Sequence, residues 1–573
     1  MAAVAKDHSL STPLLSSDQP QPQPHVIVTV QDGPDLPQPE TDPGPLFQSG
    51  DENRRNPYAF IGAHDEFEVP GSSTIDPFRN HTPNVEGFYE CLKILICLPI
   101  ALLRLVLFGL SLTVGYLITR LALCGWKDRH NPMPKWRCLL MWVTRFCGRA
   151  ILFSFGYKAL NFISFFMPQF LNSPSYHWIK RKGKPAPREI APIVVSNHVS
   201  YIDPIFFFYE IFPTIVSADT HDSMPFVGTI IRAMQVIYVD RFSKPSRKHA
   251  VNEIKRKASC NRFPRVLLFP EGTTSNGRVL LSFQIGAFIP GYPVQPVAVR
   301  YPYVHFDQSW GNITLAMLMF RMFTQFHNFM EVEYLPLVYP NENRKENAVH
   351  FSQRTGRAIA SALNVAQTAH SYGDFMLLAK AAESKQENPS LYMVELGWVQ
   401  SSLHLSVVEA LEFLEIFLSM NPDPSGLVEF RDFLRALRLK PCGLSEKMFD
   451  FIDVQKMGKI TFKQFLLGSA NILKQPLFWR ACDVSFGECA ISGNDHILKQ
   501  ELQDAVSLSI PSLNTEEIHG LFSLFDVDND DRVSRDDFIS CLRRHPLLIA
   551  LFAPKLLHRG SSIADQNLVE EVL

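Results

Sequence analysis

Three short apolar runs, each followed at once by polar residues, most constrain what this chain can fold into. They are residues 190–196 (IAPIVVS), 236–239 (VIYV) and 266–270 (VLLFP). Short runs rich in β-branched and aromatic side chains are typical of buried strands. Similar runs fall near 214–218, 294–300 and 331–337, and stretches of helical character lie near 204–211, 224–234, 246–258 and 346–363. The alternation predicts an α/β domain with a mostly parallel sheet and ligands at the carboxyl ends of its strands.

The first run leads into His198 and, five positions later, Asp203. If the chain turns back, the carboxylate holds one imidazole nitrogen and leaves the other to take a proton from a hydroxyl group. This pair resembles two-thirds of a hydrolytic triad, but the chain has no Gly-x-Ser-x-Gly nucleophile motif. We therefore predict that His198 acts directly as a general base on an alcohol that attacks an activated acyl group. The alternative is a hydrogen-bonded core histidine with Asp203 as a helix N-cap.

The other two runs end in residues suited to phosphate. Arg241 follows Asp240, and an arginine at a strand's carboxyl end is well placed for bidentate phosphate contact. Glu271, Gly272 and Thr273 follow the third run, where the glycine permits close backbone approach and the turn can cup a phosphate oxygen. We expect Glu271 to hold a ligand hydroxyl or a nearby arginine. The alternative for Arg241 is a surface ion pair with Asp240.

Together these residues resemble the four sequence blocks of the glycerolipid acyltransferase family. His198 and Asp203 match its His-x4-Asp dyad, Arg241 its second block, residues 269–272 its third and residues 294–298 its fourth. The resemblance covers about residues 85–365 and implies fatty acyl transfer from acyl-CoA to a lysolipid hydroxyl, without a covalent acyl-enzyme or a catalytic metal. The residues that it implies for substrate binding are Asn197, Arg241, Glu271, Gly272, Thr273 and Pro296.

A nearly continuous apolar stretch from Leu92 to Leu123 predicts membrane attachment. It is interrupted by Lys93, Arg104 and Arg120. We predict one membrane crossing near 95–120, with a helical pair that dips into one leaflet as the alternative. A second apolar run, 150–171, is interpreted as an interfacial or re-entrant segment. Basic residues gather after the first stretch, so the positive-inside rule places the downstream domains in the cytosol.

The C-terminal third contains a pattern of carboxylates that matches a calcium-binding EF-hand loop, residues 526–537. Its predicted ligands are Asp526, Asp528, Asp530, the carbonyl of Arg532, and Asp537. Asp531 replaces the usual glycine and must adopt a positive φ. Asp537 replaces the usual glutamate, and its shorter side chain weakens calcium binding relative to magnesium. The alternative is an acidic surface loop.

Three other segments look like degraded loops of the same kind. A weaker second ion site would use Asn421, Asp423, Ser425, Leu427 and Asp432. Residues 453–464 and 483–488 are interpreted as structural remnants, so the sequence predicts two pairs of helix–loop–helix units.

The predicted organisation has six parts. They are a disordered tail (1–85), membrane-anchoring helical segments (86–180), an α/β acyltransferase domain (181–370), a linker helix (371–400), an all-α EF-hand region (401–548) and a tail (549–573). The N-terminal tail (1–85) is rich in Pro and Gln, and its first thirty positions lack the apolar core of a signal peptide. Two glycosylation-like triplets, at Asn80 and Asn312, are interpreted as coincidental.

An acyltransferase domain followed by EF-hands resembles the EF-hand-bearing lysophospholipid acyltransferases of membrane remodelling, most closely their plant lysophosphatidylethanolamine-acylating members. The resemblance implies lysophosphatidylethanolamine as acceptor, with lysophosphatidylcholine and lysophosphatidate as further acceptors, and a Golgi, ER or late endosomal membrane. A glycerol-3-phosphate acyltransferase and an inactive calcium-responsive membrane scaffold stay open. A net charge of −2 argues against nucleic acid as a partner, and 10 cysteines without paired spacing indicate a reducing compartment. The oligomeric state is left open.

Overall fold

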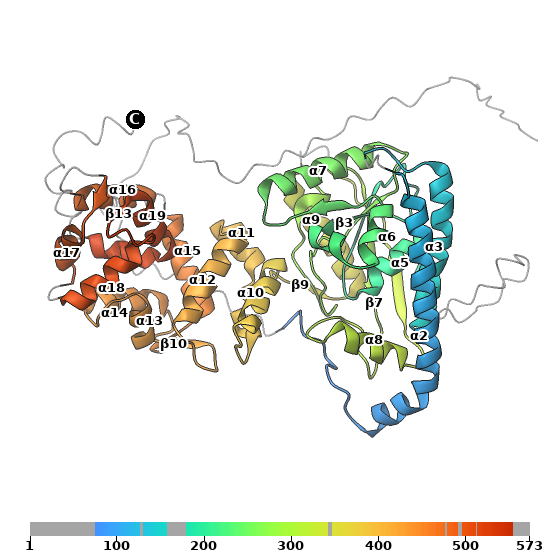
Figure 1. The fold of residues 1–573 in the computed structure, drawn as a ribbon, viewed down its shortest axis with the longest axis horizontal. Coiled ribbons are helices and arrows are strands. Elements are labelled where there is room, and N and C mark those ends of the chain that lie inside the picture. Colours follow the sequence, from blue (N-terminus) through green and yellow to red (C-terminus); the bar gives the residue numbers. More distant parts are fainter. Residues whose placement is uncertain are drawn as a thin grey trace, which may run out of the picture.

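The computed structural model describes residues 75–126, 130–157, 179–341, 346–475, 478–490, 495–510 and 513–553. An α/β part and a helical C-terminal part lie side by side, with α10 (Tyr372–Glu383) and α11 (Leu396–Leu403) between them (Figure 1). Residues 1–74, most of the run 150–171 and residues 554–573 lie outside the described segments.

A seven-stranded sheet forms the centre of the α/β part. In spatial order its strands are β1 (Ile179–Lys182), β8 (Met330–Tyr334), β7 (Val294–Arg300), β2 (Ile193–Ser196), β5 (Val266–Leu268), β3 (Thr214–Ala218) and β4 (Ile237–Val239). Only the β7–β8 pair in this sheet is antiparallel. The predicted α/β architecture and its six strands are confirmed. β1 was not predicted, because three of its four residues are charged and exposed on the sheet's edge.

Helices cover both faces of this sheet. They are α5 (Ile202–Glu210), α6 (Val227–Ala233), α7 (Lys244–Ser259), α8 (Leu315–Phe323) and α9 (Ala348–Leu363), with short turns η2 (Asp219–Ser223) and η3 (Ile285–Ala287) and a small sheet of β6 (Val279–Leu280) and β9 (Ala366–Gln367). Alternate strand residues face opposite cores: Val194 packs with α5, whereas Ile193 and Val195 pack with α7 and α9. A strand buried on both faces reads as an uninterrupted apolar run, which explains the sequence pattern.

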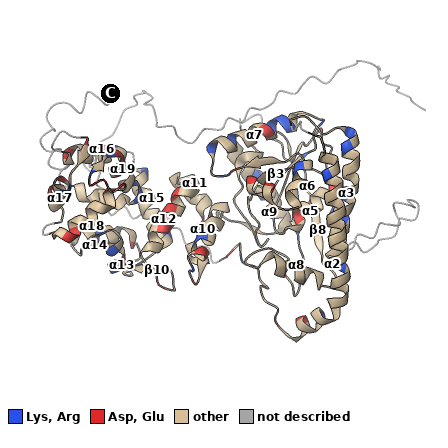
Figure 2. Ribbon diagram, in the orientation of Figure 1, with Lys and Arg blue, Asp and Glu red and all other residues tan. Residues whose placement is uncertain are grey.

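The apolar stretch forms α2 (Phe88–Leu123), which lies beside α3 (Lys135–Ser154) (Figure 1). Among the described residues α2 is the one helix long and apolar enough to cross a membrane, by length and composition. Few charged residues lie along it (Figure 2). It also packs against α6 and α8, and the Arg104 guanidinium donates to the carbonyls of Phe323 and Phe326, both at 2.8 Å.

Residues 75–84 form an ordered strap on the α/β part, so the predicted disordered tail is wrong from residue 75 onward. The side chain of Asn276 donates to the carbonyl of Asp76 at 2.8 Å and to that of Arg79 at 3.1 Å. Asn80 is fully buried, and its amide donates to the carbonyl of Ser309 at 2.7 Å. A glycan cannot be accommodated on this amide in the fold, which agrees with the interpretation of the Asn80 triplet as coincidental.

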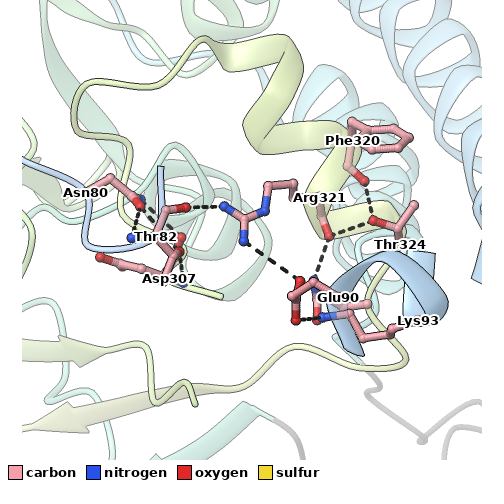
Figure 3. Close-up of polar contacts among 9 residues, drawn as sticks. Asn80, Thr82, Glu90, Lys93, Asp307, Phe320, Arg321 and Thr324 are labelled. Carbon is pink, nitrogen blue, oxygen red and sulfur yellow. Dashed lines mark hydrogen bonds and ion pairs between the residues drawn. The ribbon is translucent and has the colours of Figure 1, made fainter. Parts of the chain in front are cut away.

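A buried charge cluster joins the strap, α2 and α8 (Figure 3). Arg321 of α8 is 1% exposed, donates to the carbonyl of Thr82 and lies 3.9 Å from the Glu90 carboxylate. Glu90 also pairs with Lys93, and the Arg321 guanidinium lies 4.6 Å from the centre of the Phe306 ring. Because breaking a buried ion pair is costly, this cluster fixes the start of α2 on the α/β part.

The C-terminal part contains two pairs of helix–loop–helix units, as the sequence predicts. The first pair comprises α12 (Val407–Ser419), β10 (Leu427–Glu429), α13 (Phe430–Ala436), α14 (Gly443–Ile452), β11 (Lys459–Thr461) and α15 (Phe462–Lys474). The second comprises α16 (Phe478–Cys489), β12 (His496–Ile497), α17 (Lys499–Ser507), α18 (Thr515–Phe525), β13 (Val533–Ser534) and α19 (Arg535–Arg544). Within each pair the two loops are joined by short antiparallel strands, β10 with β11 and β12 with β13.

Three structural assignments predicted from the sequence are wrong: a loop, a linker helix and the start of the C-terminal tail. Residues 483–488 lie within α16 and form no loop; the strand that pairs with β13 of the segment 526–537 is instead β12, directly before α17. The linker 371–400 is not one helix but α10, the turn η5 (Pro389–Tyr392) and the start of α11. The tail begins later than 549, because η6 (Pro546–Phe552) is buried throughout. In each case the deciding factor is tertiary packing, which local composition does not report.

Candidate functional site

Three predicted site segments meet at one edge of the sheet. His198 follows β2, Arg241 follows β4 and Glu271 follows β5. These strands belong to the parallel set β2, β5, β3 and β4, so their carboxyl ends share an edge. The predicted location of the site at the strand carboxyl ends is therefore what the topology produces.

The structure brings His198 and Asp203 together. The imidazole Nδ1 lies 2.8 Å from a carboxylate oxygen of Asp203, which also accepts the backbone N–H groups of Val199 at 2.8 Å and Ser200 at 3.0 Å. Asp203 is fully buried, whereas the His198 side chain is 19% exposed. The carboxylate requires the proton on Nδ1, so Nε2 is the basic nitrogen. The ring also stacks on Phe269, with centres 4.1 Å apart.

Tyr301 completes the support of Asp203, and sequence reasoning missed it. Its hydroxyl donates to the second oxygen of that carboxylate. Burial, and then the negative charge of Asp203, raise the pKa of Tyr301 well above its usual value, so the phenol stays protonated and keeps donating. The available signal was its position directly after β7, which ends at Arg300.

Glu271 does not face a ligand, contrary to our expectation. It is fully buried; one oxygen accepts the backbone N–H of His198 at 2.7 Å and the other that of Leu281 at 3.1 Å. Burial raises the pKa of Glu271 to about 8, while the two backbone donors act in the opposite direction. Its role is to tie the end of β2 to the loop after β5, which positions His198.

Asn197 and Pro296 are also scaffold residues and not substrate contacts. Asn197 is 2% exposed, and its amide donates to the carbonyl of Val299 at 2.9 Å and accepts the Val299 N–H at 2.8 Å. Pro296 is buried within β7, opposite Val195 of β2. Both residues lie at the contact between β2 and β7. The family sequence blocks that contain them therefore include residues that stabilise the sheet as well as residues of the site.

Arg241 and the turn after Glu271 remain available to a ligand. The Arg241 guanidinium lies 4.3 Å from the centre of the Tyr372 ring, and Asp240 instead accepts the N–H of Phe242 at 2.9 Å. The structure therefore does not support the Asp240–Arg241 ion pair. Gly272 has φ of 77°, a conformation that favours glycine, and both it and Thr273 are partly exposed.

His221 is a further group at this edge that sequence reasoning missed. It lies in η2, directly after β3, and its Nδ1 is 2.9 Å from the Ser217 hydroxyl. Burial lowers the pKa of His221, a hydrogen bond with the Ala218 backbone acts in the opposite direction, and the charges of Arg241 and His198 lower it further. The edge thus presents two histidines and an arginine.

The acidic loop 526–537 forms the one group of three or more potential metal ligands among the described residues. One oxygen each of Asp526, Asp528 and Asp530 lie within 4.8 Å of one another. Desolvation, and then the negative charges of Asp530 and Asp537, raise the pKa of Asp528. Asp531 adopts φ of 62° where a glycine was expected, and Asp537 accepts the Ser534 hydroxyl at 2.6 Å.

In the weaker loop, 421–432, two of the carboxylates pair with basic side chains of the protein. Asp423 lies 3.4 Å from the Lys459 ammonium, and Asp432 lies 2.7 Å from the Arg435 guanidinium. Asp423 also accepts the N–H groups of Ser425 and Leu427. The second predicted ion site is therefore not favoured.

Comparisons with known proteins agree with the motifs at the sheet edge. The family model named Acyltransferase matches residues 179–300. The chain is 60% identical to the lysophospholipid acyltransferase LPEAT2 of Arabidopsis thaliana, over 96% of this chain and 99% of that protein. It is 29% identical to lysophosphatidylcholine acyltransferase 2 of Mus musculus over 81% of each. The solved 1-acyl-sn-glycerophosphate acyltransferase PlsC of Thermotoga maritima is 17% identical, with a TM-score of 0.30 over 46% of this chain and 95% of that one.

Proposed function

The chain belongs to the lysophospholipid acyltransferases, and we propose that it transfers a fatty acyl group from acyl-CoA to the free hydroxyl of a lysophospholipid. The proposed acceptor is lysophosphatidylethanolamine, with lysophosphatidylcholine and lysophosphatidate as further acceptors. The observation that carries the proposal is the His198–Asp203 pair at the carboxyl edge of the sheet, with 2.8 Å between imidazole and carboxylate and the imidazole partly exposed.

In this reaction His198 moves one proton. Nε2 takes the proton of the acceptor hydroxyl as that oxygen attacks the thioester carbonyl of acyl-CoA. The C–S bond breaks, an ester bond forms, and the imidazolium returns the proton to the departing thiolate. Asp203 stabilises the imidazolium through Nδ1, and Tyr301 and two backbone N–H groups hold Asp203 in place. No catalytic metal takes part.

The acceptor phosphate is proposed to bind between Arg241 and the turn formed by Gly272 and Thr273. The planar guanidinium suits bidentate contact with phosphate oxygens. Glu271 and Asn197 contribute by positioning the end of β2. General-base and positioning effects are each large, and base catalysis typically contributes about a hundred- to ten-thousand-fold.

α2 and α3 are proposed to hold the enzyme on an endomembrane, with its catalytic edge facing the cytosol. Both helices expose large apolar side chains, among them Leu95, Leu103, Trp136, Trp142 and Phe146. The length of α2 permits the predicted crossing at 95–120. Its contacts with α3, α6 and α8 favour the alternative, in which the pair lies in one leaflet. Labelling of single cysteines introduced near residues 88 and 123, from each side of sealed microsomes, distinguishes the two arrangements.

We propose a calcium or magnesium ion at the loop 526–537. Three carboxylate oxygens that converge within 4.8 Å repel one another until a cation binds. The short side chain of Asp537 is bonded to Ser534, which reduces its reach towards an ion.

The decisive experiment is an assay of microsomes that express the chain, with labelled acyl-CoA and a panel of lysophospholipids plus glycerol 3-phosphate, with and without calcium. We expect His198→Ala to abolish acyl transfer, whereas His350→Ala, at an exposed position of α9, should keep it. Turnover that persists in a well-folded His198→Ala protein removes the dyad from the mechanism. Transfer to glycerol 3-phosphate alone would assign the other acceptor class, and no transfer with any acceptor would favour the inactive scaffold.

A further inference from the structure

α10 follows the α/β part in sequence but returns to the acceptor edge of the sheet. Tyr372, its first residue, lies with its ring centre 4.3 Å from the Arg241 guanidinium. A Cβ built on Gly272 would lie 3.4 Å from the Cβ of Tyr372, and the Phe242 ring centre is 6.4 Å from that of Tyr372. One side chain of α10 therefore touches the strand end after β4 and the turn after β5.

The position of Tyr372 is fixed by the backbone that continues into the C-terminal part. Asp374, two residues after Tyr372 in the first turn of α10, is fully buried and accepts the N–H groups of Ser371 at 2.8 Å, Val394 at 2.9 Å and Leu396 at 2.8 Å. Ser371 in turn caps the helix in a reciprocal capping box. Because the hydrogen bonds of Asp374 tie the start of α10 to residues 394–396, Tyr372 has little freedom to leave Arg241.

The far end of α10 and η5 pack into the helical C-terminal part. Lys380 pairs with Glu415 of α12 at 2.7 Å. Tyr392 of η5 is 1% exposed, and its ring lies among those of Phe417 and Phe462, with centres 6.3 Å and 6.2 Å away. Thus α10, whose first residue contacts Arg241, packs by its other end and through η5 against the C-terminal region that is predicted to bind an ion.

We propose that Tyr372 is a positioning residue for the acceptor: it stacks on the Arg241 guanidinium and holds it in the orientation that binds the acceptor phosphate. Stacking engages the face of the guanidinium and leaves its N–H groups, which lie in the guanidinium plane, to donate to phosphate oxygens. The C-terminal part is then a structural component of the acceptor site. This inference rests on the proposed function, since it deepens the role given there to Arg241.

The first experiment compares full-length Tyr372→Leu, Tyr372→Phe and wild type. Tyr372→Leu should raise the KM for lysophospholipid about tenfold, equivalent to about 1.4 kcal/mol, because the guanidinium loses its stacking partner. The kcat and the KM for acyl-CoA should change less than about threefold. Tyr372→Phe keeps the aromatic face and should restore the wild-type KM. An equal loss in both variants would overturn the proposal.

Phe375→Leu is the matched control, since it removes the next aromatic ring of α10. Phe375 stacks on Tyr372, with ring centres 6.4 Å apart, and meets Phe78 of the strap edge-on, with ring centres 5.6 Å apart. We expect the lysophospholipid KM to rise less than about threefold in this variant. A rise as large as that of Tyr372→Leu would mean that the tyrosine acts through the packing of α10 and not through Arg241.

A double-mutant cycle separates this inference from the proposed function. In an Arg241→Ala background, Tyr372→Leu should raise the KM less than about twofold further, because the group it positions is gone. Multiplicative effects of the two changes would sink the positioning role while leaving the His198 chemistry intact. Turnover in His198→Ala, by contrast, would sink the proposed function itself.

Discussion

The carboxylates at the catalytic edge of the sheet and those of the acidic loop 526–537 have opposite electrostatic surroundings. At the sheet edge the Asp203 carboxylate accepts hydrogen bonds from His198, Tyr301 and two backbone N–H groups. In the loop, Asp526, Asp528 and Asp530 converge on one another. The first arrangement is complete without a ligand, so the base is preorganised. The second leaves three carboxylates close to one another, and the cation that we propose for this loop would neutralise them.

The loop 421–432 shows what makes this difference. There Lys459 and Arg435 stand beside the carboxylates of Asp423 and Asp432. A cation of the chain itself takes the place that an ion would fill. Two loops of similar sequence therefore differ in charge environment, through Lys459 of the partner loop and Arg435 of α13.

The largest expected effect comes from breaking the preorganised edge at its carboxylate. Asp203→Asn keeps the volume but replaces a charged acceptor with an amide, which no longer stabilises the imidazolium of His198. We expect kcat to fall by about a hundred- to ten-thousand-fold with little change in either KM, measured with saturating acyl-CoA. Tyr301→Phe, which removes one neighbouring donor, should cost far less; an equal loss would show that the orientation of the carboxylate, and not its charge, limits the rate.

The next effect tests whether Glu271 is scaffold. Glu271→Gln can still accept the N–H of His198, but its amide nitrogen cannot accept that of Leu281. One buried donor is then unpaired, which destabilises the fold by about 1–3 kcal/mol. Thermal unfolding of the purified proteins should show a lower Tm for the variant at pH 5. Thr273→Ala, at a partly exposed position two residues later, should leave the Tm nearly unchanged.

The same residue predicts a pH dependence of stability. Burial raises the pKa of Glu271 from 4.5 to about 8 in the folded protein, so the folded state binds more protons between these values. The associated stabilisation is complete below about pH 4.5 and is lost as the pH rises through about 8. The Tm difference between wild type and Glu271→Gln should therefore shrink from pH 5 to pH 9. A constant difference would mean that Glu271 is ionised throughout this range.

A smaller effect on turnover, but a clear one on binding, is expected from the acidic loop. Asp526→Asn removes a charge from the site and should weaken calcium binding at least about tenfold, measured by titration calorimetry on the full-length protein. Calcium should also raise the Tm of wild type but not of the variant. Unchanged affinity would place the ion elsewhere or exclude it.

The smallest effect is expected in the loop that its own lysine neutralises. Asp423→Asn should change calcium affinity less than about twofold, since Lys459 already occupies the carboxylate. A loss comparable to that of Asp526→Asn would show that Lys459 moves aside for an ion, and the contrast between the loops would fail.

Local pattern was enough for much of the fold. Six strands of the sheet, the His198–Asp203 contact, the apolar helix and the two pairs of helix–loop–helix units follow from runs, spacing and composition. Each depends on side chains a few residues apart, whose relative positions the backbone geometry of one strand or turn largely determines.

Roles that depend on distant partners were not predictable in this way. Three residues in motifs that resemble a binding site are buried: Glu271, Asn197 and Pro296. Glu271 and Asn197 form hydrogen bonds with the backbone of other segments, and Pro296 packs within the sheet. The position of Tyr301 directly after β7 marks it as a residue of the sheet edge but does not identify its partner, Asp203, which is 98 positions away. Tyr372 and its partner Arg241 are 131 positions apart, and no local pattern links them.

The sequence by itself determined which chemical groups the chain can offer: an imidazole with its carboxylate, an arginine at the end of a strand, a long apolar helix and a cluster of carboxylates. Only the tertiary structure decided which of those groups face a ligand and which are consumed as scaffold. The physical reason is that a buried polar group must find partners, and those partners are chosen by packing between segments remote in sequence.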